Sequence, residues 1–228
     1  VEMLAVVAII SLLMALLFPA LNSAREAMHK AGCQSNLRQF GIGLIAQAER
    51  TNSYCTGAFS WEYDGPVTRV GWVADLVNAG IPVGKMLCTS NPAKISETYC
   101  DLWDMDPTKD TCVDRKGAAP TLGPDGVTII DDNPCYTIVN DSVGAGEARR
   151  HLVEEQTFKE HFNTNYAASW WLVRSGVTLD GNGNPTTRTS GCGPSMWQRS
   201  STLGPLSRER AGSAAASASF IPLLGCGA

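Results

Sequence analysis

The most prominent hydrophobic pattern lies at the start of the chain. From Met3 to Leu21 no residue is charged, and Ser11 is the only hydroxyl in this run. A helix that is apolar on every side cannot be a surface helix of a soluble domain, so it belongs in a bilayer or at the centre of an assembly. The charge that precedes the run is Glu2. An ionised carboxylate beside a bilayer-length apolar segment requires a cationic partner or a role.

The helical pattern continues after the apolar run. Residues 22–50 contain no proline, and their apolar positions recur at spacings of three and four. This spacing predicts an amphipathic helix that packs one stripe against a head. The stripe consists of Leu37, Phe40, Gly41, Leu44, Ile45 and Ala48. We therefore expect a stem helix over residues 1–50, ~75 Å long at a rise of about 1.5 Å per residue.

Pro19 lies deep in the apolar run. There it removes one backbone donor and clashes with the preceding helical turn. In surroundings without water, neighbouring helices can satisfy the backbone groups that a broken helix leaves free. We favour partial melting between Ser11 and Pro19 over a simple proline kink.

Beyond residue 50 the regular pattern dissolves, and we expect a head of short elements over residues 51–228. Helices are predicted at 71–78, closed by Gly80, at 93–102 and at 146–162. Strands are predicted at 86–88, 165–179 and 220–224, and the segments 127–130 and 135–139 are strands or buried segments. The predicted fold class is α+β, with the stem packed on a small, loop-rich head that contains antiparallel sheet.

The composition narrows the classes of function. Net charge is −4 and charged residues make up 18% of the 228, so the chain has no basic footprint for nucleic acid. Eight cysteines are present, and none forms a C-x-x-C pair, so zinc ribbons and thioredoxin-like redox sites are unsupported. We expect up to four disulfides in an oxidising compartment, with 105 possible pairings. The candidates are Cys33, Cys55, Cys88, Cys100, Cys112, Cys135, Cys192 and Cys226.

The N-terminal stretch carries a family resemblance. Val1-Glu2, the apolar run with its proline, and the segment SAREAMHKAGCQSNLRQFGIGL together resemble the N-terminal signature of type IV pilins and type II secretion pseudopilins. The segments at 24–27 and 33–39 are similar to the large pilin-like family abundant in planctomycete bacteria. GWVADLVNAGIPVGKMLCTSNP and TNYAASWW also look like that family. Family members carry a short aromatic-led segment before the glutamate, so we expect residues upstream of Val1.

The resemblance implies a pilin-like fold and assembly of identical subunits into a helical filament. It also implies a prepilin peptidase and a pilus assembly machinery as partners. The subunit would lie in the inner membrane before assembly and in an extracellular or periplasmic filament at the cell surface afterwards. Glu2 would neutralise the N-terminal amine of a neighbouring subunit, and the stretch from Ser11 to Pro19 would be extended in the filament.

Two polar constellations have a chemical alternative. Asp180, Asn182 and Asn184 occupy alternate positions as in a calcium loop, but Pro185 stands at the sixth position and Gly191 at the twelfth. Because Asn-Gly is typical of hairpin turns, we expect a hairpin, with calcium as the alternative.

A second constellation, His151 with Glu154 and Glu155, has helical metal-ligand spacing. A solvated helical face explains it equally well. No metal and no cofactor are therefore predicted.

No motif indicates an enzyme. The serines lack a G-x-S-x-G elbow, and the three histidines, His29, His151 and His161, have no recognisable catalytic partners. We expect a structural subunit that polymerises through its N-terminal helix. The alternatives are a single-pass anchored extracytoplasmic binding module that does not polymerise and, less favoured, a membrane-tethered hydrolase.

Overall fold

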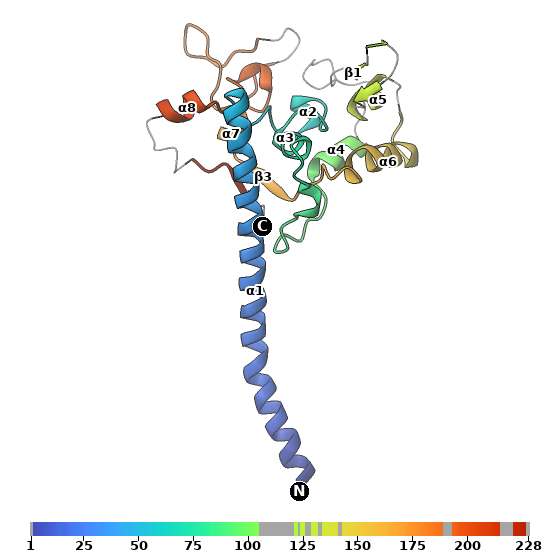
Figure 1. Cartoon of the computed structure of the whole chain (residues 1–228), viewed down its shortest axis with the longest axis vertical. Helices are drawn as coiled ribbons and strands as arrows, with labels where there is room; N and C mark the ends of the chain where they lie inside the picture. Colours follow the sequence, from blue (N-terminus) through green and yellow to red (C-terminus); the bar gives the residue numbers. More distant parts are fainter. Residues whose placement is uncertain are drawn as a thin grey trace.

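A long helix carries a head at one end. The computed structural model describes residues 2–104, 121–122, 124–125, 129–131, 134–140, 143–188, 193–214 and 221–226. Helix α1 (Glu2–Thr51) spans 50 residues, and the head surrounds only its C-terminal half (Figure 1). The predicted stem helix is confirmed over its described residues, from Glu2 onward.

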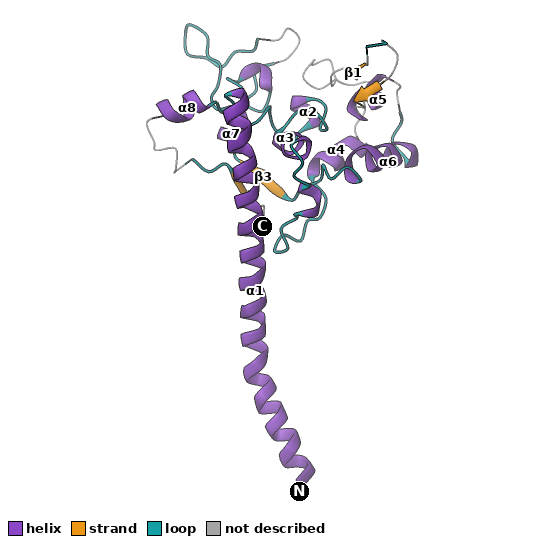
Figure 2. Cartoon of the chain, viewed as in Figure 1, coloured by secondary structure: helices purple, strands orange, loops and turns teal. Residues whose placement is uncertain are grey.

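The head consists of short elements joined by long loops (Figure 2). Its α-helices are α2 (Trp61–Asp64), α3 (Trp72–Asn78), α4 (Glu97–Asp104), α5 (Pro134–Asn140), α6 (Glu147–Val153), α7 (Trp170–Arg174) and α8 (Arg208–Ser213). Single turns of other helix types are η1 (Val83–Lys85), η3 (Glu154–Phe158) and η4 (Arg199–Ser201). The strands are β1 (Thr121–Leu122), β2 (Ile129–Asp131), β3 (Tyr166–Ala168) and β4 (Leu224–Cys226). They form two antiparallel pairs, β1–β2 and β3–β4, so mixed α/β content with small antiparallel sheets is confirmed.

The stem joins the head through the stripe that the sequence predicted. Phe40, Leu44 and Ala48 are buried, and Phe40 makes edge contacts with Trp72 and Tyr166 at ring-centroid distances of 6.0 and 5.3 Å. These contacts join α1 to α3 and to β3. The stripe is narrower than predicted, because Ile45 is 51% exposed.

A glycine sets the closest approach of stem and head. A Cβ atom on Gly43 would lie 2.5 Å from Leu76 Cδ2 and 2.6 Å from Ile81 Cδ1. Both distances are shorter than real Cβ contacts allow, so the missing side chain lets α3 and the segment after it pack directly on α1. The sequence interpretation did not identify this role for Gly43.

A second apolar cluster lies in the part of the head built by α2, α4, α5 and α6. Its buried members are Trp61, Val67, Tyr99, Leu102, Cys135, Ile138 and Val153. The helix predicted at 146–162 is confirmed in its main part as α6 and the π-helical turn η3, which place Val153 and Phe158 against this cluster. The helix α3 and its closure are also confirmed, with Gly80 at a φ of 89°.

The apolar run of the stem is continuous. The chain is helical through both Ser11 and Pro19, and Ser11 Oγ donates to the carbonyl oxygen of Val7 at 2.8 Å. The stem curves gently toward its N-terminal end (Figure 1). The single chain therefore does not show the partial melting that we favoured, because its backbone stays helical from Glu2 to Thr51.

Two predicted elements around residue 90 need correction. The segment 86–88 is not a strand, because side-chain amides take the hydrogen bonds that a neighbouring strand would make. Asn36 Nδ2 donates to the Met86 carbonyl, and Asn165 pairs with both the N–H and the carbonyl of Cys88. The following helix begins at Glu97 instead of residue 93.

Three predicted strands also differ from the structure. In the segment 165–179 only Tyr166–Ala168 is a strand, because Ser169 caps a helix by accepting a hydrogen bond from the Leu172 N–H. The segment 135–139, predicted as a strand or a buried segment, lies in helix α5, where Cys135 and Ile138 are buried. The last strand is β4, two residues beyond the predicted end; Phe220, where the prediction began, lies outside the described residues.

Candidate functional site

The surface of the stem is the first candidate site. In residues 3–21 the large apolar side chains are 48–83% exposed, and they lie on every side of the helix. They are Met3, Leu4, Val6, Val7, Ile9, Ile10, Leu12, Leu13, Met14, Leu16, Leu17, Phe18 and Leu21. The helix is long and apolar enough to cross a membrane, and Glu2 is its first residue. Water is an unfavourable environment for such a surface, so it requires lipid or protein around it.

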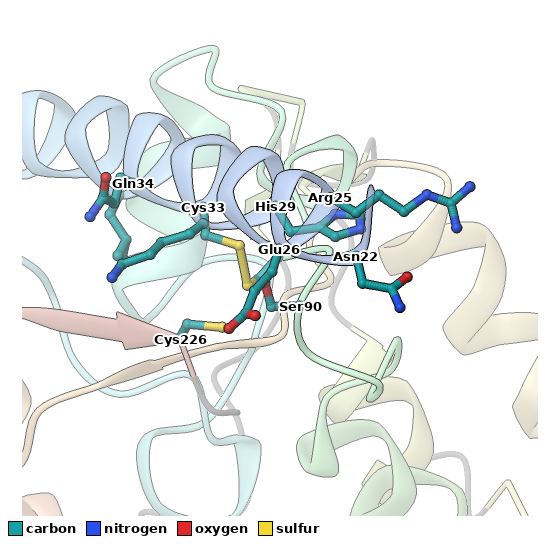
Figure 3. A pocket seen from close by; sticks show the side chains of 11 residues that line it. Asn22, Arg25, Glu26, His29, Cys33, Gln34, Ser90 and Cys226 are labelled. Atoms are coloured by element: carbon teal, nitrogen blue, oxygen red, sulfur yellow. A yellow bond between two sulfur atoms is a disulfide. The ribbon is translucent and has the colours of Figure 1, made fainter. Parts of the chain in front are cut away.

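A pocket lies where the stem meets the head (Figure 3). Its volume is about 670 Å³, and one wall is the face of α1 from Asn22 to Leu37. Arg25 and Lys30 bring positive charge to this wall and Glu26 brings one carboxylate, while His29 Nδ1 lies 2.8 Å from Thr89 Oγ1. The pocket therefore has a mostly apolar lining with a small excess of positive side chains.

Three sulfur atoms line the inner end of this pocket. Cys33 of α1 is disulfide-bonded to Cys88, and Cys226 of β4 also reaches the pocket. The three Sγ atoms all lie within 4.8 Å of one another. Within the part of the chain that the structure describes, this trio is the one cluster of His, Cys, Asp or Glu side chains close enough to hold a metal ion.

Separate elements hold each sulfur in place. The side chain of Asn165 fixes Cys88 by accepting from its N–H at 2.7 Å and donating to its carbonyl at 2.9 Å. Cys226 is opposite Tyr166 in the β3–β4 register. The hydroxyl of Tyr166 accepts from Asn36 Nδ2 at 3.1 Å, which links the sheet to α1. The trio is thus assembled from the stem, a loop and the last strand.

Of the up to four disulfides expected, the described residues contain one, Cys33–Cys88. Cys55 is a buried thiol in the core, Cys100 is an exposed thiol on α4, and Cys226 is an unbridged thiol. Burial raises the pKa of Cys55 far above its usual range and that of Cys135 to about 12, so both thiols stay neutral. The remaining candidates, Cys112 and Cys192, lie outside the described residues.

A second groove, with a volume of about 510 Å³, lies on the head. Aromatic rings are prominent in its lining, and they include Tyr63, Trp170 and the exposed Trp197. Trp170 Nε1 donates to the Met196 carbonyl at 2.9 Å, which orients its ring. The groove combines apolar rings with polar groups such as Glu97, a lining typical of ligand sites.

A buried ion pair lies beside this groove, and its arginine, Arg174, is part of the lining. Both nitrogens of the Arg174 fork donate to Asp64, Nη1 to Oδ1 at 2.9 Å and Nη2 to Oδ2 at 2.7 Å. The two side chains are 3% and 0% exposed. Burial raises the pKa of the Asp64 carboxyl, while the guanidinium opposes this shift. The sequence interpretation missed the pair because the residues are 110 positions apart.

The first polar constellation forms a turn. Asp180 Oδ1 accepts from the N–H groups of Asn182 and Asn184 at 2.8 Å, and Leu179 bridges to Pro185. These backbone hydrogen bonds lower the pKa of Asp180. The predicted hairpin turn is confirmed. Asp180 Oδ1, one of the oxygens considered for calcium, accepts hydrogen bonds from the backbone.

The second constellation lies on solvated helical surface. His151 Nε2 is 3.7 Å from Glu155 Oε1, and Glu155 also pairs with Lys159. All three side chains are substantially exposed. This arrangement matches the solvated-face interpretation.

Comparisons with known protein families, curated proteins and solved structures find no match. The pilin-like resemblance of the N-terminal sequence therefore remains a prediction, and function has to be argued from the geometry.

Proposed function

We propose that this protein is a structural subunit that polymerises through α1 into a type IV pilus-like or pseudopilus-like filament. The observation that carries the proposal is the N-terminal part of the stem, residues 3–21, whose apolar side chains are exposed all round and which extends away from the folded head (Figure 1). Before assembly this surface would lie in the inner membrane. After assembly the stems of neighbouring subunits would surround it, in a filament outside the membrane.

Burial of the apolar surface favours both membrane insertion and filament assembly. Moving so many large apolar side chains out of water contributes tens of kcal/mol at ~25 cal/mol per Å², before the entropy of association is subtracted. Lipid tails and neighbouring stems are similarly apolar, however, so this term holds the stem in either environment without choosing between them. The choice requires a group that lipid cannot satisfy.

Glu2 is the residue that we assign to this choice. It precedes the apolar run, where a carboxylate in lipid is costly. In a bundle of stems it would meet the N-terminal amine of a neighbour, and attraction between such charges grows as the dielectric constant falls. Glu2 would thus set the register of the assembly, as the family resemblance also implies.

Substitution of Glu2 tests the proposal. We expect Glu2→Ala and Glu2→Leu to insert and fold normally but to lower filament yield at least ~tenfold, because breaking a buried charge pair costs several kcal/mol. Glu2→Lys should assemble less well still, since it would place like charges together. The measurement is filament number by negative-stain microscopy at matched subunit levels.

Matched controls come from the head. Asp180→Ala and His151→Ala change exposed polar residues far from the stem surface, so filament number should not change. If Glu2→Ala forms filaments at the wild-type yield, Glu2 has no role in assembly.

The second candidate is a single-pass anchored module that binds a ligand and does not polymerise. The aromatic groove beside Trp170 and Trp197 is the observation that favours it. Purified wild-type protein that stays monomeric in every condition, with its stem in detergent, would move this candidate to first place.

A further inference from the structure

The three-sulfur cluster combines a closed disulfide with a third thiol of different accessibility. The bonded sulfurs belong to buried residues, since Cys33 is 6% exposed and Cys88 is fully buried. Cys226 is only half-buried and lies within 4.8 Å of both sulfur atoms. A thiol at this distance is a neighbour that can attack the disulfide, and it is the member of the cluster that solvent reaches most easily.

We propose that Cys33, Cys88 and Cys226 form a thiol–disulfide exchange site in which Cys226 is the exchanging thiol. The Cys226 thiolate attacks one sulfur of the Cys33–Cys88 bond. A new bond forms from Cys226 to the attacked sulfur, and the other sulfur leaves with the electron pair and takes up a proton. One disulfide and one thiol are present before and after the step, so no oxidant or reductant is consumed.

The two products differ in what they connect. Attack on Cys33 joins the stem to β4 and releases Cys88 as a thiol. Attack on Cys88 joins β4 to the loop before Ser90 and releases Cys33 as a thiol. Both attacks break the Cys33–Cys88 bond, so both remove the covalent link between that loop and the stem. Since β4 already lies against α1 and is held by β3, either product requires only local movement.

Exchange moves one sulfur of the disulfide to a residue that is more exposed. In the Cys33–Cys88 form both sulfurs belong to buried residues, whereas either product places one sulfur of the bond on Cys226. The pocket in front of the cluster has a volume of about 670 Å³, large enough for a small molecule. Its lining carries Arg25 and Lys30 against the single carboxylate Glu26, so the external partner that fits is a small anionic thiol.

The first test maps disulfides in the full-length wild-type protein in detergent. Samples held at neutral pH are quenched with acid, which removes thiolates and stops exchange, and the linked peptides are then identified by mass spectrometry. We expect the Cys33–Cys88 linkage together with a detectable fraction of Cys226-linked peptides. Complete absence of Cys226-linked peptides after prolonged incubation would overturn the proposal.

The second test measures reduction by ~0.1 mM glutathione. Exchange places one sulfur of the bond on the half-buried Cys226, where glutathione can reach it, so the wild-type protein should be reduced at least ~tenfold faster than Cys226→Ser. Cys100→Ser is the matched control, because it removes an exposed thiol outside the cluster and should leave the rate unchanged. Equal rates for wild type and Cys226→Ser, with both variants folded by circular dichroism, would also overturn the proposal.

A charge test examines the choice of thiol. The rate at which each thiol reduces the protein is divided by its rate with a small-molecule disulfide. In wild type, this relative rate should be higher for anionic glutathione than for neutral mercaptoethanol. Arg25→Gln should reduce this preference, because it removes a cation from the pocket wall. If Arg25→Gln keeps the same preference for glutathione over mercaptoethanol, the assignment of an anionic thiol is refuted. The exchange itself is decided by the first two tests.

Discussion

Replacing Arg174 by methionine tests whether the buried ion pair organises the head. In the folded protein the guanidinium donates to both oxygens of Asp64, to the Trp197 carbonyl at 2.8 Å and to the Val173 carbonyl at 3.2 Å. Without it, the donor that the described residues still offer the Asp64 carboxylate is the N–H of Ala58, at 2.9 Å. A fully buried charge would then lack its counter-ion.

The expected cost follows from this burial. Breaking a buried ion pair by removing one partner destabilises a protein by roughly 3–5 kcal/mol, because the other charge stays desolvated. Total stabilities are only about 5–15 kcal/mol, so Arg174→Met should remove a large fraction of the stability of the head. The double variant Asp64→Asn/Arg174→Met should be more stable than Arg174→Met alone, because asparagine removes the charge and can still accept from Ala58.

Urea unfolding followed by tryptophan fluorescence measures these differences. All six tryptophans lie beyond the stem, so the signal reports on the head. The loss in Arg174→Met should shrink as the pH becomes acidic, since protonation of Asp64 removes the unpaired charge. Lys159→Met, which breaks an exposed pair with Glu155, should leave the midpoint unchanged. A cost below about 1 kcal/mol for Arg174→Met would refute the reasoning. So would a double variant whose loss of stability equals the sum of the losses in Asp64→Asn and Arg174→Met.

Two further predictions use the same assay. Gly43→Ala should destabilise the head by ~1–3 kcal/mol, because its Cβ would clash with Leu76 and Ile81. Gly41→Ala, which has open space around it, should instead stabilise the helix by ~0.5–1 kcal/mol. Equal effects of the two substitutions would contradict the close packing at Gly43. Burial raises the pKa of Cys55 above that of the unfolded thiol, so the folded state binds more protons at alkaline pH and the free energy of unfolding should fall as the pH rises above about 9. This fall should be up to ~1.4 kcal/mol per pH unit steeper than in Cys55→Ala, and identical slopes would show that the thiol is not buried.

Features that depend on neighbouring residues were predictable from the sequence. The stem needs only an uninterrupted run of helix-compatible residues, and its two halves differ in exposure as the apolar pattern indicates. The end of α3 at Gly80 and the turn begun by Asp180 were also predictable, because each is fixed by hydrogen bonds within a few residues. Local periodicity and turn chemistry contain this information directly.

Elements whose backbone hydrogen bonds are taken by a side chain were not predictable from periodicity. The alternating pattern after Asn165 suggested one long strand, but a single capping hydroxyl at Ser169 converts its middle into helix α7. The segment ending at Cys88 has the composition of a strand, yet amides from α1 and from Asn165 take its hydrogen bonds. In each case the competing partner lies elsewhere in the fold or acts through a short local bond, and periodicity does not record it.

The candidate sites divide in the same way. The stem surface was visible in the sequence because exposure of an all-apolar helix follows from its composition. The tertiary structure alone brings Cys226 to Cys33 and Cys88, and pairs Asp64 with Arg174, because these residues are far apart in the chain. Eight cysteines allow 105 pairings, so only the packing of β4 against α1 selects which sulfur atoms meet.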